Sequence, residues 1–344
     1  MSSLSADCLS IIFMNFHNDL KTLYYCLLVN SLWCATVIPI LWSNPWKYQF
    51  ELLPNGSLST DHKRFIKVER QSLLLLMTLS AYLTNDTIRF LRNYGIRINF
   101  GPPLFNYLKY CRTLNTYDID YMLIKAQRNL DCFYTDDTRD FLGLEIYRLL
   151  FRQSSIITCM KISHPISPLY SKIWHFPGAV SYFSNLKELT CYEPYTIELN
   201  LLNYIAEYSS NIKKLSVNSK IYIHHDEGLI ELIQKQNNLT SLSLTNISHE
   251  LWAKVANAFT SNHATSLTHL YLKSFDTCLP ALGIHELRNL RSLIITSHEI
   301  DWSDISNAYF PFLEILEFGK YFPSMKILAS IISRTNNMLK RIYL

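Results

Sequence analysis

The sequence predicts an α/β chain in which a small helical module is followed by a curved solenoid of parallel strands and helices. Three observations predict this fold. An apolar pattern, L-x-x-L-x-L with other apolar residues allowed, recurs seven times after residue 185. Segments with the apolar spacing of helices lie between the copies. Ahead of them, residues 4–46 carry large apolar side chains at helical spacing, including three of the six tryptophans.

Residues 1–46 are interpreted as the helical module. One apolar stripe has the spacing i, i+3, i+4, i+7 and consists of Leu9, Ile12, Phe13 and Phe16. A second stripe runs at four-residue steps through Val29, Trp33, Val37 and Leu41. Pro39 interrupts the second stripe, so we expect that helix to kink or end near Ile38. The module has more large apolar side chains than a small core needs, which predicts a patch that docks on a partner.

Residues 47–103 are interpreted as a helical connector. Residues 54–62, with the sequence PNGSLSTDH, are rich in turn formers and predict a loop. A helical stretch is expected from about Lys63 to Tyr94, with Gly95 as its C-cap. Gly101, Pro102 and Pro103 then punctuate the chain, and the repeat domain is expected to occupy residues 104–344.

The seven copies of the apolar pattern define the repeat. They are Leu186/Leu189/Cys191, Ile212/Leu215/Val217, Leu239/Leu242/Leu244, Leu267/Leu270/Leu272, Leu290/Leu293/Ile295, Leu313/Leu316/Phe318 and Leu339/Ile342/Leu344. Their first positions are 23 to 28 residues apart, within the range of leucine-rich repeats. Two more degenerate copies are expected at Ile157/Met160/Ile162 and at Leu130/Phe133.

Helices are expected between the strands. Three groups of apolar residues mark them: Leu229, Leu232 and Ile233; Leu251, Trp252, Val255, Ala256 and Phe259; and Met325, Leu328, Ile331 and Ile332. Strand and helix alternating at this period predict a solenoid with parallel strands on its concave face. The asparagine or cysteine that usually closes the pattern is absent, so the curve is expected to be irregular.

The module also resembles a known family. The pattern Leu4-x-x-Asp7-x-Leu9-x-x-Ile12-Phe13, then Asp19-Leu20, Val29-Asn30-x-x-Trp33 and Leu41-Trp42, is similar to an F-box. F-boxes are short helical modules that bind the Skp adaptor of cullin-RING ubiquitin ligases. Ser5 stands where that family usually has proline. An F-box followed by irregular leucine-rich repeats resembles the F-box/leucine-rich-repeat proteins, particularly the expanded families of some fungi.

This resemblance implies a function. In that family the F-box holds the ligase and the repeats hold a protein substrate, which is ubiquitinated and passed to proteasomal degradation. The chain would then be a non-catalytic substrate receptor. The residues proposed to bind or support the adaptor are Leu4, Leu9, Ile12, Phe13, Val29, Trp33 and Trp42.

The residues between the leucines of each copy predict the substrate surface, because side chains alternate faces along a strand. The candidates on the concave face are Tyr192, Lys214, Asn218, His269, Tyr271 and Lys273. The two tyrosines are aromatic anchors of the kind that carry interfaces.

Other function classes find little support in the sequence. The net charge is +4 and the longest basic runs are pairs, which argues against nucleic-acid binding. The eight cysteines lack metal-ligand spacing, no cofactor motif occurs, and the adjacent histidines His224 and His225 would point to opposite faces of a strand. No signal peptide or membrane span is predicted, so we expect a cytoplasmic or nuclear location without a metal or cofactor.

Two alternatives to the ligase receptor stay open. One is a leucine-rich-repeat scaffold or inhibitor outside any ligase, whose N-terminal helices only cap the repeats. The other is an enzyme with an unrecognised site, which would need a pocket with strongly perturbed titrating groups.

Overall fold

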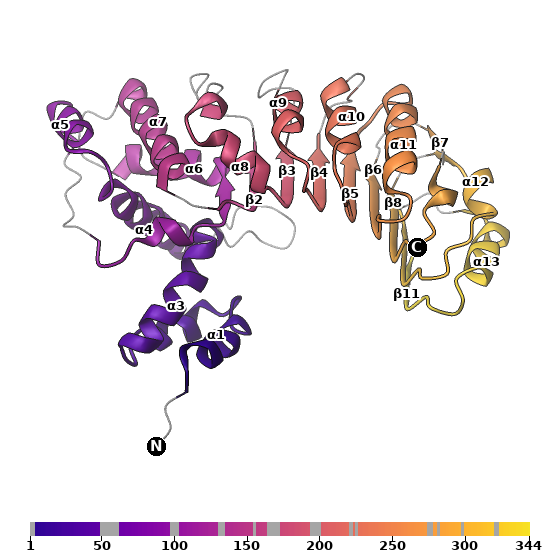
Figure 1. The fold of residues 1–344 in the computed structure, drawn as a ribbon, viewed down its shortest axis with the longest axis horizontal. Coiled ribbons are helices and arrows are strands. Elements are labelled where there is room, and N and C mark those ends of the chain that lie inside the picture. The colour runs from indigo at the N-terminus through magenta and orange to yellow at the C-terminus, as the bar shows by residue number, and fades with distance from the viewer. Residues whose placement is uncertain are drawn as a thin grey trace. The chain divides into compact units, whose positions relative to one another are not determined.

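The computed structural model describes residues 4–48, 62–96, 103–129, 135–153, 156–163, 173–192, 201–219, 223, 226–273, 278–280, 283–296, 299–319 and 323–344. The chain has a mixed α/β fold with a parallel sheet (Figure 1), which confirms this much of the predicted fold class. It divides into two compact units. Unit 1 holds residues 1–160 and 165–182, and unit 2 holds residues 161–164 and 183–344. In the described part of the chain, no helix is both long and apolar enough to span a membrane.

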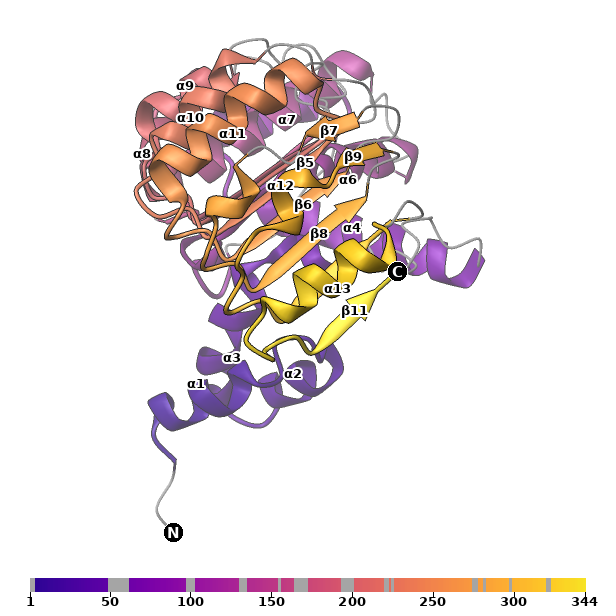
Figure 2. The ribbon, with the colours of Figure 1, turned by 90° about the vertical axis from the view of Figure 1, so that its right-hand side faces the viewer.

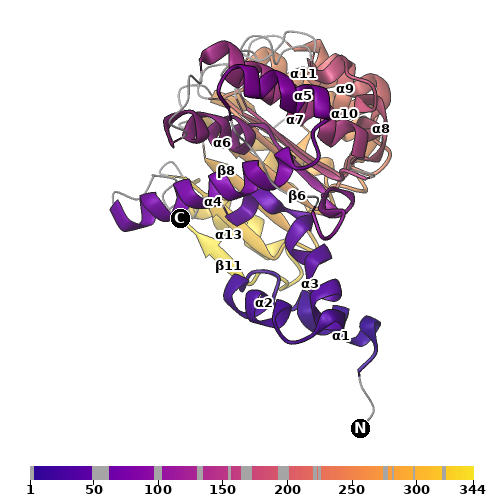
Figure 3. The ribbon, with the colours of Figure 1, turned by 90° about the vertical axis from the view of Figure 1, so that its left-hand side faces the viewer.

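Unit 1 begins with three helices: α1 (Ala6–Met14), α2 (Leu20–Leu27) and α3 (Ser31–Ser43) (Figure 3). Each starts at a polar residue whose side-chain oxygen accepts a hydrogen bond from a first-turn amide. The capping residues are Ser5, Asp19 and Asn30. Such caps satisfy amides that the helix itself leaves unpaired. The three helices share one core, made of Leu9, Phe13, Leu23, Cys26 and Val37, with Leu27, Trp33, Ile40 and Leu41 packed against it.

Pro39 does not end α3, so the predicted end near Ile38 is wrong. The helix continues to Ser43 with the proline inside. Proline removes one hydrogen bond, to the carbonyl oxygen four residues earlier. That residue, Ala35, is exposed, so water can reach its carbonyl. Val37 and Ile38 are buried on one side of the proline, and Ile40 and Leu41 pack into the core on the other. This burial on both sides offsets the lost bond.

The helical stretch expected from about Lys63 to Tyr94 consists of two helices. They are α4 (His62–Ser80) and α5 (Asn85–Asn93). The hydroxyl of Thr84 accepts from the amide of Thr87 and starts a new helix there. Gly95 ends α5 in a left-handed conformation, one residue after the C-cap Tyr94. Its φ is 79°, its amide donates to Arg92, and the next amide, of Ile96, donates to Leu91, which is the Schellman arrangement. The loop expected at residues 54–62 lies, apart from His62, outside the described residues.

The rest of unit 1 contains two further helices and several shorter elements. Its elements are η1 (Pro45–Tyr48), η2 (Tyr107–Tyr110), β1 (Thr113–Asn115), α6 (Thr116–Asn129) and α7 (Asp136–Gln153). The boundary between the units falls within β2 (Cys159–Ile162) and α8 (Ala179–Asn185). β2 coincides with one of the degenerate copies of the pattern. The other, at Leu130 and Phe133, lies outside the described residues.

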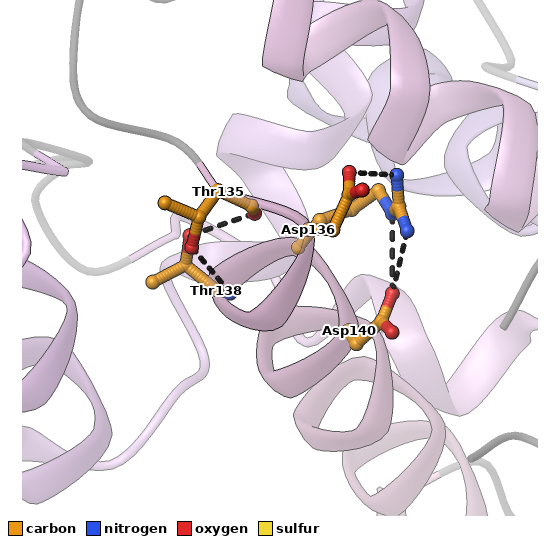
Figure 4. A network of polar contacts seen from close by, with 5 residues as sticks. Thr135, Asp136, Thr138 and Asp140 are labelled. Carbon is orange, nitrogen blue, oxygen red and sulfur yellow. Dashed lines mark hydrogen bonds and ion pairs between the residues drawn. The ribbon is translucent and has the colours of Figure 1, made fainter.

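Polar contacts brace the first turns of α7 (Figure 4). The hydroxyl of Thr135 accepts from the amide of Thr138 at 3.3 Å. The guanidinium of Arg139 bridges Asp136 at 2.8 Å and Asp140 at 2.9 Å, with the Arg139 and Asp140 side chains each 13% exposed. Carboxylates near a helix N-terminus also suit its dipole. These contacts fix the start of a helix whose apolar residues, among them Leu142 and Ile146, are fully buried.

Unit 2 confirms all seven predicted strands. They are β3 (Glu188–Tyr192), β4 (Lys214–Asn218), β5 (Ser241–Thr245), β6 (His269–Lys273), β8 (Ser292–Thr296), β10 (Ile315–Phe318) and β11 (Arg341–Tyr343). Neighbours in this series pair in parallel, side by side in Figure 1. The middle apolar residue of each copy aligns across the sheet: Leu189, Leu215, Leu242, Leu270, Leu293, Leu316 and Ile342.

A backbone contact repeats at the start of each strand. The carbonyl oxygen of Lys187 accepts from two successive amides of the next copy, those of Lys213 and Lys214. The same two-donor contact recurs at the carbonyls of Lys213, Thr240, Thr268, Arg291 and Glu314. The hydroxyls of Thr240 and Thr268 also donate to the carbonyl oxygens of Lys213 and Thr240, each at 3.0 Å. The backbone part of the contact is the same in every copy, so the side chain at this position can be basic, acidic or a hydroxyl. The contact sets the register that aligns the leucines.

Helices cover one face of this sheet. Figure 2 shows α9 (Leu201–Tyr208), α10 (Glu227–Gln234) and α11 (His249–His263) side by side. Shorter elements follow: β7 (Cys278–Pro280), η5 (Ile284–Glu286), β9 (Glu299–Asp301), α12 (Ser303–Ser306) and α13 (Met325–Ser333). β7 and β9 pair with each other. The three helices predicted from apolar groups are confirmed as α10, α11 and α13.

Buried amides join neighbouring copies of the repeat. Asn246, one residue before the usual asparagine position, donates from Nδ2 to the carbonyl oxygen of Ser219 at 2.6 Å. Gln236 accepts from the amide of Ile212 at 2.8 Å and donates to the carbonyl of Ser209 at 2.9 Å. Both side chains are buried, so they replace, at shifted positions, contacts that an asparagine ladder would make.

Candidate functional site

Two surfaces are the candidate functional regions among the described residues. No group of three or more His, Cys, Asp or Glu residues in the described ranges could hold a metal ion, and His224 and His225 lie outside those ranges. Burial raises the pKa of Cys111 to about 12 and that of Cys191 to about 12. Both thiols therefore stay protonated at neutral pH and act as core residues.

The first candidate is the apolar surface of the three N-terminal helices, called here the module surface. Ten large apolar side chains between residues 4 and 32 are exposed: Leu4, Ile11, Ile12, Met14, Phe16, Tyr24, Tyr25, Leu28, Val29 and Leu32. Leu28 is 68% exposed. Single exposed apolar residues are ordinary, but this density on so short a segment is typical of a protein-interaction site.

The structure separates the proposed adaptor residues by position. Leu4, Ile12 and Val29 are exposed on the module surface. Leu9 and Phe13 are each only 2% exposed and belong to the module's core. They can support an interface but cannot contact a partner.

The two remaining proposed residues are tryptophans with different surroundings. Trp33 is half-buried, with its ring edge-to-face against Phe13 at 5.0 Å. Trp42 is stacked on Tyr107 at 4.7 Å. Trp33 therefore supports the module's core, whereas Trp42 packs against η2.

Contacts at Trp42, Ser43 and Trp46, called here the joint, attach the module to the rest of unit 1. Trp46 is fully buried, and its Nε1 donates to the carbonyl oxygen of Thr113 at 2.7 Å. The amide of Arg112 donates to the carbonyl oxygen of Ser43 at 2.9 Å. Together with the stack of Trp42 on Tyr107, these contacts bind the end of α3 to η2 and β1. The role of Trp42 is therefore attachment.

Sequence reasoning missed much of the module surface. It did not select Ile11, Met14, Tyr24, Tyr25, Leu28 or Leu32, all of which are exposed. The available signal was the excess of apolar residues beside each stripe. Tyr24 and Tyr25 lie next to each other with ring centroids 6.1 Å apart, and only one face of α2 can enter the core.

The second candidate is the polar face of the unit 2 sheet, made of the residues between the leucines. Burial alternates along the strands as expected, with the leucines buried and the intervening residues more exposed. Tyr192 is exposed and lies opposite Asn218 in the register. Lys214 and His269 occupy the same row with Ser241 between them. Tyr271 and Lys273 are half-buried in the two rows beyond. The sheet therefore brings all six predicted residues onto one face.

Several of these side chains already have partners. Lys214 forms an ion pair with Glu188 at 2.6 Å. Asn218 donates to the hydroxyl of Ser216 at 3.0 Å, and a ring nitrogen of His269 lies 2.8 Å from the hydroxyl of Thr268. The face is thus a preorganised polar surface.

Comparison with known proteins adds no further constraint. No protein-family model matches the chain, and no curated protein matches it. A functional assignment therefore rests on the residues and on the two surfaces they form.

Proposed function

We propose that this chain is the substrate-recognition subunit of a Skp-cullin-F-box type ubiquitin ligase. The module surface binds the Skp adaptor, and the polar face of the unit 2 sheet binds a protein substrate. The chain is then a non-catalytic receptor, because ubiquitin transfer is carried out by its partners.

The observation that carries the proposal is the exposed apolar surface of a module that is otherwise well built. The three helices have side-chain caps and a shared buried core. Ser5, which departs from the family pattern, itself caps α1 by accepting from the amide of Cys8 at 3.3 Å. The exposed apolar residues are not needed for this core, so a partner is the simplest reason for them.

A binding measurement with charge-bearing variants tests the proposal. Full-length protein and purified Skp adaptor are mixed, and the dissociation constant is compared with that of a double variant, Leu28→Glu with Val29→Glu. Both positions are exposed, so the variant should fold. Two buried interface positions typically cost at least about 2 kcal/mol together, which weakens binding about 30-fold.

The matched control is Leu104→Glu, at an exposed leucine in unit 1 outside the module. It should bind the adaptor as the natural protein does. If the natural protein does not bind, or if all three proteins bind equally, the ligase proposal is wrong.

The alternative is a scaffold or inhibitor whose N-terminal helices only complete unit 1. The joint at Trp42 and Trp46 favours it, because the module is packed on its neighbours as a structural part would be. This alternative predicts that the Leu28→Glu, Val29→Glu variant changes no adaptor interaction, since none exists.

A further inference from the structure

A polar hollow lies where three copies of the repeat enter their strands in unit 2. Its volume is about 220 Å³. It is lined by the residues just before β3, β4 and β5, and among the described residues these are only lysine, asparagine and serine. Lys187, Lys213, Asn211, Asn237 and Asn238 supply its strongest hydrogen-bond donors.

The two lysines of the hollow have no carboxylate partner among the described residues. The described residues place no hydrogen-bond or ion-pair partner at the ammonium group of Lys187 or of Lys213. Other lysines of unit 2 are paired: Lys214 with Glu188, Lys235 with Glu231, Lys254 with Glu227 and Lys340 with Glu314. The hollow is therefore lined by two positively charged side chains, one from each of two successive copies.

Two asparagines of the hollow, Asn211 and Asn238, have side-chain donors with no partner among the described residues. In a later copy, Asn289 occupies the position before the first leucine, and its Nδ2 donates to the carbonyl oxygen of Thr265 at 2.6 Å. Asn262 similarly donates to Gln234 at 3.0 Å. Within the described chain, the side-chain amides of Asn211 and Asn238, at the same position as Asn289, make no such bond. Their amide groups are available to a ligand.

We propose that this hollow binds a phosphate monoester. Such a group carries about −1.5 to −2 charges at pH 7 and has three strong acceptor oxygens. Two ammonium groups match that charge, and carboxamide N–H groups match the remaining acceptors. A carboxylate, with one charge and two oxygens, would use only part of the site.

The site is independent of the adaptor proposal. The hollow belongs to unit 2, whereas the module surface belongs to unit 1. Failure of adaptor binding leaves the phosphate site standing, and failure of phosphate binding leaves the adaptor proposal standing.

Titration of the full-length protein tests the proposal. The probes are inorganic phosphate and O-phosphoserine, added at constant ionic strength with chloride as the reference anion, and binding is followed by calorimetry or by NMR. The test variant is Lys187→Gln with Lys213→Gln. We expect the natural protein to bind both probes and the variant to bind them at least about tenfold more weakly.

The matched control is Lys326→Gln, which removes one charge from an exposed lysine remote in sequence from the hollow. It should leave phosphate binding unchanged, and the thermal midpoints of all three proteins show whether they are folded. A second variant, Asn211→Ala with Asn238→Ala, keeps the charge and should still weaken binding.

A third probe, a short peptide with one phosphoserine, shows which kind of molecule supplies the phosphate. The unphosphorylated form of the peptide is its control. Tighter binding of the phosphopeptide than of O-phosphoserine identifies a phosphorylated protein, and equal binding identifies a small phosphorylated molecule. No binding of any phosphate probe by the natural protein overturns the proposal. Equal loss in the Lys326→Gln control also overturns it, because the effect would then be one of general charge.

Discussion

The N-terminal helices and the repeat of unit 2 use apolar residues in opposite ways. In the strands of the repeat, nearly every leucine-type position from Leu186 to Leu316 is fully buried, and most of the residues between them are polar. In the module, Leu9 and Phe13 are buried, but Ile11, Leu28 and eight other large apolar residues are exposed. Folding accounts for the apolar residues of the repeat and leaves those of the module surface unexplained.

The difference separates two reasons for keeping an apolar side chain. A leucine that is buried in the folded chain stabilises that chain, whereas a leucine that stays exposed gains its free energy only when a partner covers it. The same substitution should therefore have different consequences in the two regions.

The largest expected effect is the difference in the free energy of unfolding between Leu242→Ala and Leu28→Ala. Leu242 is fully buried and aligned with Leu215 and Leu270 on the neighbouring strands, so its truncation should lower the free energy of unfolding by about 2–5 kcal/mol. Leu28→Ala should change it by less than about 0.5 kcal/mol. Urea unfolding of both variants measures the difference. Equal losses of stability would break the comparison.

A smaller effect concerns the cap of α1. Ser5→Ala removes the oxygen that accepts from the amide of Cys8, and should destabilise the module by about 1 kcal/mol. Ser5→Pro restores the residue that the F-box pattern usually has. It should cost less than Ser5→Ala, because the φ of Ser5 is −68° and suits proline. Hydrogen exchange of the amides of α1 measures both. The absence of any loss for Ser5→Ala would contradict the capping role of the Ser5 hydroxyl.

The smallest expected effect is the pH dependence of a surface ion pair in the repeat. The hydrogen bond from Lys340, helped by Arg291, holds the pKa of Glu314 below its ordinary value of 4.5. A lowered carboxyl pKa stabilises the fold above that ordinary value, and the contribution is lost as the pH falls through the lowered value. Glu314→Gln should remove a small part of the acid sensitivity at low salt. The measurement is unfolding at several pH values between 5 and 3. If Glu314→Gln and the natural protein lose stability equally over this range, the ion pair does not contribute to acid sensitivity.

The repeat could be predicted from sequence because its signals agree. Every apolar position of the first six copies is buried, and the carbonyl that begins each copy accepts from two backbone amides whatever its own side chain. The residue type at this position therefore varies, as in Lys187, Thr240 and Glu314, while the spacing of the repeat is kept. Asn246 was not predicted to be structural, because it lies one residue before the usual asparagine position.

The N-terminal half was harder to predict because local signals compete there. Thr84 begins a new helix within a stretch whose apolar spacing favours one continuous helix. Pro39 favours a helix end, but burial of Val37 and Ile38 keeps the helix intact. Which apolar residues of the module face the core depends on how three helices pack. The sequence pattern shows which residues share one side of a helix, but it does not show which other helix that side packs against. The functional division into residues 1–46, 47–103 and 104–344 remains a prediction.

The heat-capacity change of adaptor binding tests the central claim most directly. Calorimetric titration of the full-length protein with the Skp adaptor at several temperatures gives this quantity. If the module surface is what the adaptor covers, the heat-capacity change is clearly negative, because apolar surface leaves water, and it is smaller in magnitude for Leu28→Ala. The account is contradicted if there is no binding, or if binding occurs with a heat-capacity change near zero that Leu28→Ala does not alter.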